Sequence, residues 1–476
     1  MPIQEKSTGL KAYRIAFVAA IGGFLFGFDL GMIPSANIYL RDQFQLSESQ
    51  FGFATASAVL GCVFGPALGF WLCDAIGRKQ TMIVAAIFLA LSAIITAVPD
   101  IAGTDGPATM NVFNFFRFVG GLGVGLCSIA SPMFISEVAP HNKRGSLGLM
   151  YQLAIVTGHI VAPLIAFIIV YVLRYQYGVQ DGTIPANAWL QAWRWMFASE
   201  TVCVLMFLYF VFTLPRSPRW LAEKGRDEEA LAVLTSVDGP EFAKIEMAAI
   251  KEQLSEEPGG WSEVFAPGMR FALLTGILLA FFNNWTGWSV IAGYIPDLFE
   301  KSGLEDRAMA ILQFAMTYLF MGLMTVVSLV LMDRAGRRPL WMVASALAAI
   351  IMTITGAVFH FQWSGPIVFL VIILCTIPHG IALGGIPWLM MSELFPTRIR
   401  AKAVAVTTTI LWCFIYFGAQ LFPPISAFSK EMIGSVGGAF WLFAAICLLS
   451  LLFGWTIMPE TKGKTLEEIA ASWKSS

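Results

Sequence analysis

The sequence predicts an all-α membrane protein in which twelve transmembrane helices form two pseudo-symmetric six-helix bundles. The first observation behind this prediction is composition: 57% of the 476 residues are hydrophobic and 13% are charged, about half the charged fraction of soluble domains. A water-soluble globule of this size could not hide so much apolar surface. The second observation is the spacing of long uncharged stretches, and the third is an internal repeat of charged motifs.

Uncharged stretches mark the spans, because a helix needs about 20 apolar residues to cross the hydrocarbon core of a bilayer. A long stretch, 339–392, breaks near Gly365-Pro366 and makes two spans. The spans that lack any charge are 51–73, 80–99, 145–173, 271–296, 308–332, 403–429 and 432–459. The spans that contain one charge are 15–40 with Asp29, 106–136 with Arg117, and 195–215 with Glu200.

Lys and Arg in the short loops set the orientation, since cytoplasmic loops carry an excess of both. The four loops after even-numbered spans hold ten of these residues, whereas the six loops after odd-numbered spans hold six. Both termini are therefore predicted to be cytoplasmic. The expected organisation is an N-terminal bundle at 1–214, a cytoplasmic segment of short amphipathic helices at 215–268, a C-terminal bundle at 269–458 and a cytoplasmic tail at 459–476.

Composition and motifs also exclude several classes of function. The net charge of −1 argues against a nucleic-acid partner, which requires a basic face. The sequence has no nucleophile–base–acid arrangement, no metal-ligand spacing and no phosphate-binding loop, so we expect neither an enzyme nor a metal or cofactor site. Glycines at 120, 121, 123 and 125 lie within a span and indicate close helix packing.

Two charged motifs occur once in each half of the chain. An Asp-x-x-Gly-Arg motif recurs after 259 residues, and a Glu-x-x-Pro-x-x-x-Arg motif recurs after 256 residues. This repetition predicts two bundles related by an axis along the membrane normal, with a binding site between them near the midplane. We expect ion-pair networks that gate the cytoplasmic side, built from Asp74, Arg78, Glu137, Arg144, Asp333, Arg337, Glu393 and Arg400.

Asp29 and Arg117 lie in the middle of predicted spans, where a charge costs about 2.5–3.5 kcal/mol on the insertion scale. Removal from water raises the proton affinity of a carboxyl, and a nearby guanidinium lowers it. A change of conformation that separates the two groups would therefore move a proton. The alternative is a permanent structural salt bridge. Glu200 is a third intramembrane acid, nearer to a helix end, and a further candidate for proton coupling.

These motifs resemble the sugar porter family of the major facilitator superfamily, from about residue 13 to residue 468. The matching stretches are 22–29, 131–140, 193–200, 387–396 and 459–463. Within the family, the Phe-Ala-Ser-Glu run that ends at Glu200, together with Asp29, is most similar to the bacterial proton-coupled xylose symporters. The resemblance implies the major facilitator fold.

The resemblance also implies a sugar site. It places Gln152 against the sugar, and His159 lies seven residues further along the same helix face. A lone intramembrane His is alternatively a hydrogen-bonded packing residue. The other expected contacts are Asn283, Asn284, Ser289, Trp388 and Trp412. Two asparagines replace the family's longer glutamines, and Leu411 replaces a polar residue. The polar rim, meaning the side chains that would bond the sugar hydroxyls, thus offers fewer and shorter hydrogen-bonding groups than is usual in the family. This favours a less hydroxylated or smaller sugar, a polyol or a cyclic hydroxy acid.

The resulting hypothesis is a monomeric, proton-coupled symporter that moves a monosaccharide or similar polyol across the plasma (inner) membrane by alternating access. Its expected partners are the sugar or polyol, protons and the lipid bilayer. Two alternatives remain open. The first is a facilitative uniporter of the same substrate class, in which the Asp29–Arg117 pair is only structural. The second is a transporter-like sugar sensor.

Overall fold

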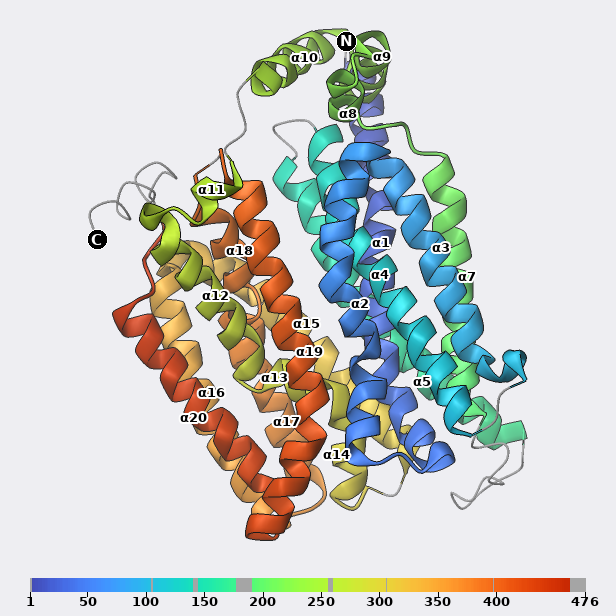
Figure 1. The fold of residues 1–476 in the computed structure, drawn as a ribbon, viewed down its shortest axis with the longest axis vertical. Coiled ribbons are helices and arrows are strands. Elements are labelled where there is room, and N and C mark those ends of the chain that lie inside the picture. The colour runs from blue at the N-terminus through green and yellow to red at the C-terminus, as the bar shows by residue number, and fades with distance from the viewer. Residues whose placement is uncertain are drawn as a thin grey trace. The chain divides into compact units, whose positions relative to one another are not determined.

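The computed structural model describes residues 2–103, 106–139, 144–176, 191–255, 260–304, 306–396 and 398–462. This part of the chain is helical and contains no strand (Figure 1). Eleven of its helices are long and apolar enough to cross a membrane. The predicted all-α membrane class is therefore confirmed. Arg144 and Asp333 lie in helices, but their side chains fall outside the described part.

Six long helices form the first half of the chain. They are α1 (Pro2–Phe44), α2 (Glu48–Ala75), α3 (Arg78–Ala97), α4 (Pro107–Val138), α5 (Arg144–Gln176) and α7 (Ala192–Phe212). The second half contains α12 (Arg270–Trp285), α13 (Trp288–Ile291), α14 (Ile295–Lys301), α15 (Arg307–Ala335), α16 (Arg337–His360), α17 (Pro366–Pro378), α18 (Ile386–Glu393), α19 (Arg400–Ile433) and α20 (Gly437–Thr456). Each predicted span overlaps one or more of these helices.

The span expected at 271–296 is a broken helix. Regular α12 stops at Trp285, and short segments follow: α13, the 3₁₀ turn η4 (Ala292–Tyr294) and α14. Gly287 lies at the break with φ +113°, a conformation that L residues rarely adopt. The split explains why eleven rather than twelve helices reach spanning length.

The span that begins at Pro366 is also interrupted. The helix α17 continues into a π-helical turn, η5 (His379–Leu383), before α18 resumes. A π-helical turn displaces backbone carbonyls from the regular hydrogen-bond ladder, and such turns are frequent at functional sites. The predicted break near Gly365-Pro366 is confirmed, since Gly365 precedes Pro366 at the first position of α17.

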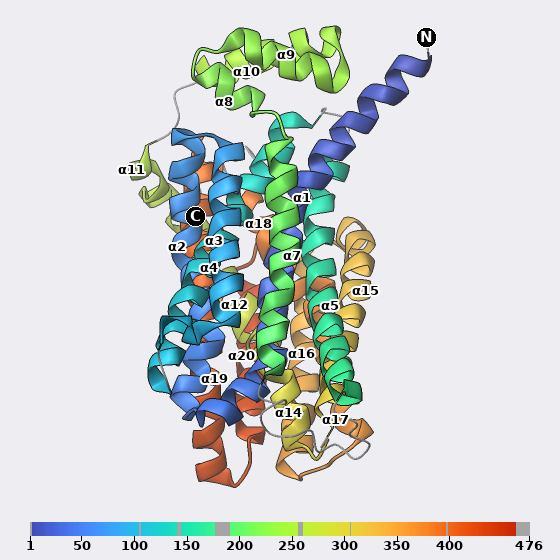
Figure 2. The ribbon, with the colours of Figure 1, turned by 90° about the vertical axis from the view of Figure 1, so that its right-hand side faces the viewer.

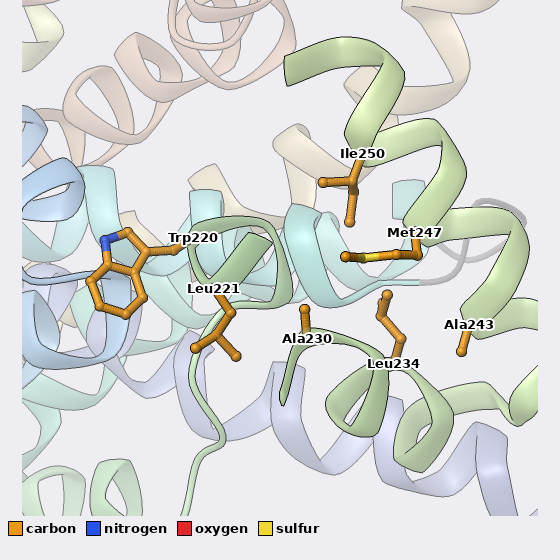
Figure 3. Close-up of a cluster of buried hydrophobic side chains, with 7 residues drawn as sticks. All are labelled: Trp220, Leu221, Ala230, Leu234, Ala243, Met247 and Ile250. Carbon is orange, nitrogen blue, oxygen red and sulfur yellow. The ribbon is translucent and has the colours of Figure 1, made fainter. Parts of the chain in front are cut away.

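Short helices fill the charge-rich segment at 215–268. They are α8 (Pro218–Glu223), α9 (Asp227–Asp238), α10 (Pro240–Ser255) and α11 (Trp261–Val264). The first three lie together (Figure 2) and enclose a small apolar cluster. Figure 3 shows Leu234 from α9 and Met247 and Ile250 from α10 pointing into the same space. This part is therefore a small folded unit, as its amphipathic pattern predicts; its cytoplasmic location stays a prediction.

The helices form two compact units. The first contains Met1–Met32, Leu60–Ala162 and Arg194–Glu257; the second contains Ile33–Val59, Pro163–Trp193 and Pro258–Ser476. The division cuts α1 beside Pro34 and cuts α5 at Pro163. Proline removes a helical hydrogen bond, so both cuts fall at natural bending points. The second unit thus includes the ends of four helices from the first half of the chain: those of α1, α2 and α5, and the first two residues of α7.

Glycines permit close helix packing inside each unit, as the sequence predicts. A Cβ on Gly61 would lie 2.1 Å from the Phe118 carbonyl oxygen, and one on Gly125 would lie 2.6 Å from the Gly65 Cα. In the second unit, a Cβ on Gly437 would lie 2.4 Å from the Gly356 carbonyl oxygen. Backbones this close allow van der Waals contact without lipid between them.

The break at Gly287 generates a stability prediction. In Gly287→Ala, the positive φ strains the backbone, and the new Cβ meets Met352 Cε at 2.6 Å. We expect a loss of about 1–3 kcal/mol in unfolding free energy, measured as a lower Tm of the purified protein in detergent.

The matched control is Gly148→Ala, since this helical glycine has open space around it. Alanine favours a helix over glycine by about 1 kcal/mol, so the control should keep or raise the Tm. An unchanged Tm in Gly287→Ala would show that the break tolerates an ordinary residue.

Candidate functional site

The first unit buries an acid–base pair at its centre. Arg117 of α4 donates a hydrogen bond from Nη1 to Asp29 of α1, and both side chains are fully buried. Arg117 also lies over the ring of Phe197, 5.2 Å from its centroid. Its Nε and Nη2 have no hydrogen-bond partner among the described residues. The pair predicted from sequence is therefore formed, but it is incompletely satisfied.

Glu200 of α7 completes a three-charge cluster with this pair. Its side chain is fully buried, and it interacts electrostatically with Asp29 and Arg117. The carboxyls of Glu200 and Asp29 also lie within side-chain hydrogen-bonding reach of each other. The cluster therefore contains two carboxyl groups and one guanidinium. Its charges balance only when one carboxyl holds a proton.

Close contact between α1 and α5 fixes the backbone around Asp29. A Cβ on Gly27 would lie 2.0 Å from the Ile155 carbonyl oxygen, and one on Gly158 would lie 2.2 Å from the Phe24 carbonyl oxygen. Larger residues would force the helices apart. The glycine-rich run that precedes Asp29 thus holds the acid at a defined depth against α4 and α5.

The two polar residues predicted on α5 differ in their surroundings. Gln152 is exposed, as a ligand-binding side chain requires. His159 is partly buried; its Nδ1 lies 3.0 Å from the Ile155 carbonyl oxygen, and its ring meets Phe26 edge-on. This bond within its own helix is what a packing histidine makes. A sugar contact by either residue stays a prediction.

The two asparagines near the break of α12 bond to backbone. Asn283 Nδ2 donates to the carbonyl oxygens of Leu383 at 2.7 Å and Gly384 at 3.1 Å, beside the π-helical turn η5. Asn284 Nδ2 donates to Ala280 in its own helix at 3.0 Å. Ser289 Oγ donates to the Asn283 carbonyl oxygen at 3.3 Å. These polar groups therefore already have partners in this conformation.

The aromatic candidates are also unequal. Trp388 is 44% exposed, whereas Trp412 is 1% exposed. Leu411 is fully buried against Ala280 and Met391, so it belongs to an apolar cluster. Trp388 thus lies at a surface, whereas Trp412 is packed inside the second unit. A sugar contact by either tryptophan stays a prediction.

The repeated motifs form matching triads, one in each unit. In the first, Arg78 Nη2 lies 2.8 Å from Glu137 Oε1, and the Ser217 hydroxyl donates to the other carboxylate oxygen at 2.5 Å. In the second, Arg337 lies 3.1 Å from Glu393, and the Thr461 hydroxyl donates to the other oxygen at 2.5 Å.

Two other members of the predicted networks make longer contacts, and two have side chains outside the described part of the chain. Asp74 is half-exposed and lies 3.7 Å from Arg78. Arg400 donates to the Phe395 carbonyl oxygen at 3.3 Å. The side chains of Arg144 and Asp333 lie outside the described part. The hydroxyl members, Ser217 and Thr461, were not predicted, although each lies in the proline-containing motif that ends its half of the chain.

A third set of charges, which we name the α14 network, was missed by sequence analysis. It joins the ends of α1, α2 and α5 to α14 and α15, all within the second unit. Arg41 lies 2.5 Å from Glu48 and 3.1 Å from Asp297, and Arg307 pairs with Asp42 and Glu300. Each charge looks like an ordinary loop residue in sequence, because the pairs Arg41–Asp297 and Arg307–Asp42 join positions 256 and 265 residues apart.

Arg174 and Asp306 form a further pair of the α14 network. Two parallel hydrogen bonds of 2.6 and 3.0 Å join them, and Asp306 also caps α15. Burial alone would raise the pKa of Asp306, but the hydrogen bonds from Arg174 and from the Met309 and Ala308 N–H groups hold it below its usual value. The pair therefore stays ionised at all pH values above the ordinary range of an aspartate.

The chain is similar in sequence to known transport proteins. Residues 15–473 match the family described as "Sugar (and other) transporter". The chain is 36% identical over 463 residues to the arabinose-proton symporter of Bacillus subtilis (strain 168), covering 96% of this chain and 94% of that protein. It is 32% identical over 485 residues to the D-xylose-proton symporter of Escherichia coli (strain K12), covering 97% and 96%.

The fold agrees with a solved member. The inward-open structure of the E. coli xylose transporter superposes with a TM-score of 0.83 at 30% identity, covering 97% of this chain and all of that one. This likeness, the family match and the repeated motifs all point to a multi-pass membrane transporter rather than an enzyme. The chain belongs to the sugar porter family of the major facilitator superfamily.

Proposed function

We propose that this protein is a proton-coupled symporter that moves a monosaccharide or similar polyol across the plasma (inner) membrane. The observation that carries the proposal is the buried cluster of two carboxyls and one guanidinium formed by Asp29, Glu200 and Arg117. A permanent structural salt bridge would have its polar atoms satisfied, whereas this cluster leaves Arg117 Nε and Nη2 without partners among the described residues. Relatives named as arabinose-proton and xylose-proton symporters support the same reading.

The cluster works as a proton switch through charge balance. An uncompensated carboxylate removed from water costs several kcal/mol, so the buried cluster keeps one proton on its two carboxyls. When Asp29 holds the proton, its attraction to Arg117 weakens. When Asp29 loses the proton, the ion pair with Arg117 forms again. Each step favours a different position of α1 relative to α4, which couples protonation to conformation.

Alternating access then uses charges at opposite helix ends. The distribution of Lys and Arg assigns the repeated triads and both termini to the cytoplasm, and it assigns the α14 network to the outside. The α14 network ties the outer ends of α1, α2 and α5 to the second half of the chain. Its ion pairs therefore stabilise the conformation that is closed to the outside. The triads of Arg78 and Arg337 organise the cytoplasmic gate.

The substrate site is the set inferred from the family, with Gln152 on α5 and the aromatic wall of Trp388 and Trp412. The bonds from Asn283 and Asn284 to backbone carbonyls support a thin polar rim. Because the site then has fewer free amides to bond hydroxyls, it favours a ligand that carries fewer hydroxyls than a hexose. Pentoses, which the two relatives' names specify, fit this description.

The coupling prediction concerns Asp29→Asn, which fixes the neutral form of the side chain. We expect uptake against a concentration gradient to be abolished, while counterflow, which needs no net proton movement, is largely kept. The measurement is radiolabelled D-xylose and arabinose uptake into proteoliposomes with and without a pH gradient. Continued accumulation by Asp29→Asn under an imposed pH gradient would show that Asp29 is not the proton switch. A wild type that equilibrates both sugars but accumulates neither would favour the facilitative uniporter with a merely structural Asp29–Arg117 pair.

The matched control is the same substitution in the α14 network, Asp306→Asn. The pKa of Asp306 is held below its usual value of 3.8. Its stabilising charge is therefore complete above that value and is lost only as the pH falls further. Between about pH 5 and 8, Asp306 does not titrate. The variant should change the rate of uptake and keep its pH dependence, which Asp29→Asn should lose.

The substrate prediction concerns Gln152→Ala. A lost hydrogen bond to a buried ligand group costs about 1–3 kcal/mol, so the apparent affinity should fall about tenfold or more. Gln176→Ala, at the exposed end of the same helix, is the control and should leave affinity unchanged. Equal affinities for wild type and Gln152→Ala in a sugar competition assay would remove Gln152 from the site.

A further inference from the structure

The second unit contains a cavity of about 830 Å³ to which the transport cycle described above assigns no ligand. Arg41, Glu48 and Asp297 of the α14 network form part of its wall, and it lies between the adjoining ends of α1 and α2 and the helices α14 and α19. None of the predicted sugar or proton residues lines it. Its volume is within the range of about 300–1,000 Å³ typical of small-molecule sites.

The charges that line the cavity are balanced. They are three basic residues, Arg41, Lys301 and Lys430, and three acidic residues, Glu48, Asp297 and Glu431. Asp297 bonds to both Arg41 and Lys301, at 3.1 and 2.8 Å. A cavity built for an anion or a cation would carry an excess of the opposite charge. This one favours a neutral ligand that can both donate and accept hydrogen bonds.

Aromatic rings supply an apolar surface on the same cavity. Trp363, in the turn between α16 and α17, is 53% exposed. Tyr294 and Phe422 line the cavity as a ring pair with centroids 5.1 Å apart. Sugar rings present apolar C–H faces and a hydroxyl rim. The exposed indole of Trp363 matches the apolar C–H face of a sugar, and the paired charges of the same cavity match its hydroxyl rim.

A buried hydroxyl on the cavity wall lacks a partner. Ser426 of α19 is 8% exposed, and its Oγ makes no hydrogen bond to any described residue. Such a group costs about 1–3 kcal/mol when it is left unsatisfied. An unsatisfied buried hydroxyl on the wall of a cavity indicates a place where a ligand can bond.

We propose that this cavity, which we name the vestibule, is a second binding site for a neutral monosaccharide or polyol on the outer face. The proposal rests on the proposed function for its ligand class and for its orientation. The vestibule is lined both by Arg41, Glu48 and Phe51 from α1 and α2 and by residues of α14 and α19. A sugar bound there bridges these elements and holds the outer side closed. High external sugar should therefore slow transport.

The test is equilibrium dialysis of radiolabelled D-xylose and arabinose against the purified full-length chain, in a detergent without a sugar headgroup. Wild type should show a tighter and a weaker site. Ser426→Leu, which removes the unsatisfied hydroxyl and places a bulky apolar side chain on the vestibule wall, and Trp363→Ala, which removes its aromatic face, should each lose the weaker site only. Trp455→Ala, at a tryptophan that is 65% exposed and outside the vestibule, is the control and should keep both sites.

The outcomes separate the two proposals. Gln152→Ala should weaken the tighter site and leave the weaker one. If Ser426→Leu and Trp363→Ala both keep every site of the wild type, the vestibule proposal is wrong and the transport function stands. If wild type binds neither sugar, the sugar assignment fails for the vestibule and the transport site together. In proteoliposomes, inhibition by high external sugar should disappear in Ser426→Leu, and its persistence there would contradict the vestibule.

Discussion

Buried charge balance at the Asp29–Arg117–Glu200 cluster is the constraint on which the rest of this protein depends. Three ionisable groups in a bilayer are tolerated only if they neutralise one another, and two carboxyls with one guanidinium require a proton to do so. The glycines of α1 and α5 follow from this constraint, since Gly27 and Gly158 bring the backbones close enough to fix the depth of Asp29. Packing and proton binding are therefore aspects of one arrangement.

The helix α1 connects this cluster to the charges of the α14 network. Asp29 belongs to the first compact unit, while Arg41 and Asp42 belong to the second and form part of the α14 network. About 18 Å of helix separates Asp29 from Arg41, at 1.5 Å per residue. Pro34 lies between them, where the unit boundary crosses α1. A shift of Asp29 relative to Arg117 thus acts on a helix that has a bending point and an anchored far end.

Sequence patterns predicted the membrane class, nearly all spans and the buried pair, because these depend on composition and on charges within apolar runs. The triads of Arg78 and Arg337 were predictable as well, since they repeat at a constant offset. The α14 network was not predictable, because Arg41 and Asp297 lie 256 residues apart. The vestibule escaped for the same reason. The break at Gly287 was also missed, because a single glycine in an apolar run does not reveal its φ angle.

Asn283 shows how a substitution in the presumed sugar site acquires a structural role. Its side-chain amide donates to two carbonyls beside the π-helical turn η5, so it joins the broken span that contains Gly287 to the interrupted span that contains His379. A longer glutamine would extend past these carbonyls by one methylene. The amide predicted to bind a ligand is instead engaged in hydrogen bonds between two helix breaks. A single side chain thus determines how the broken span packs against the interrupted one.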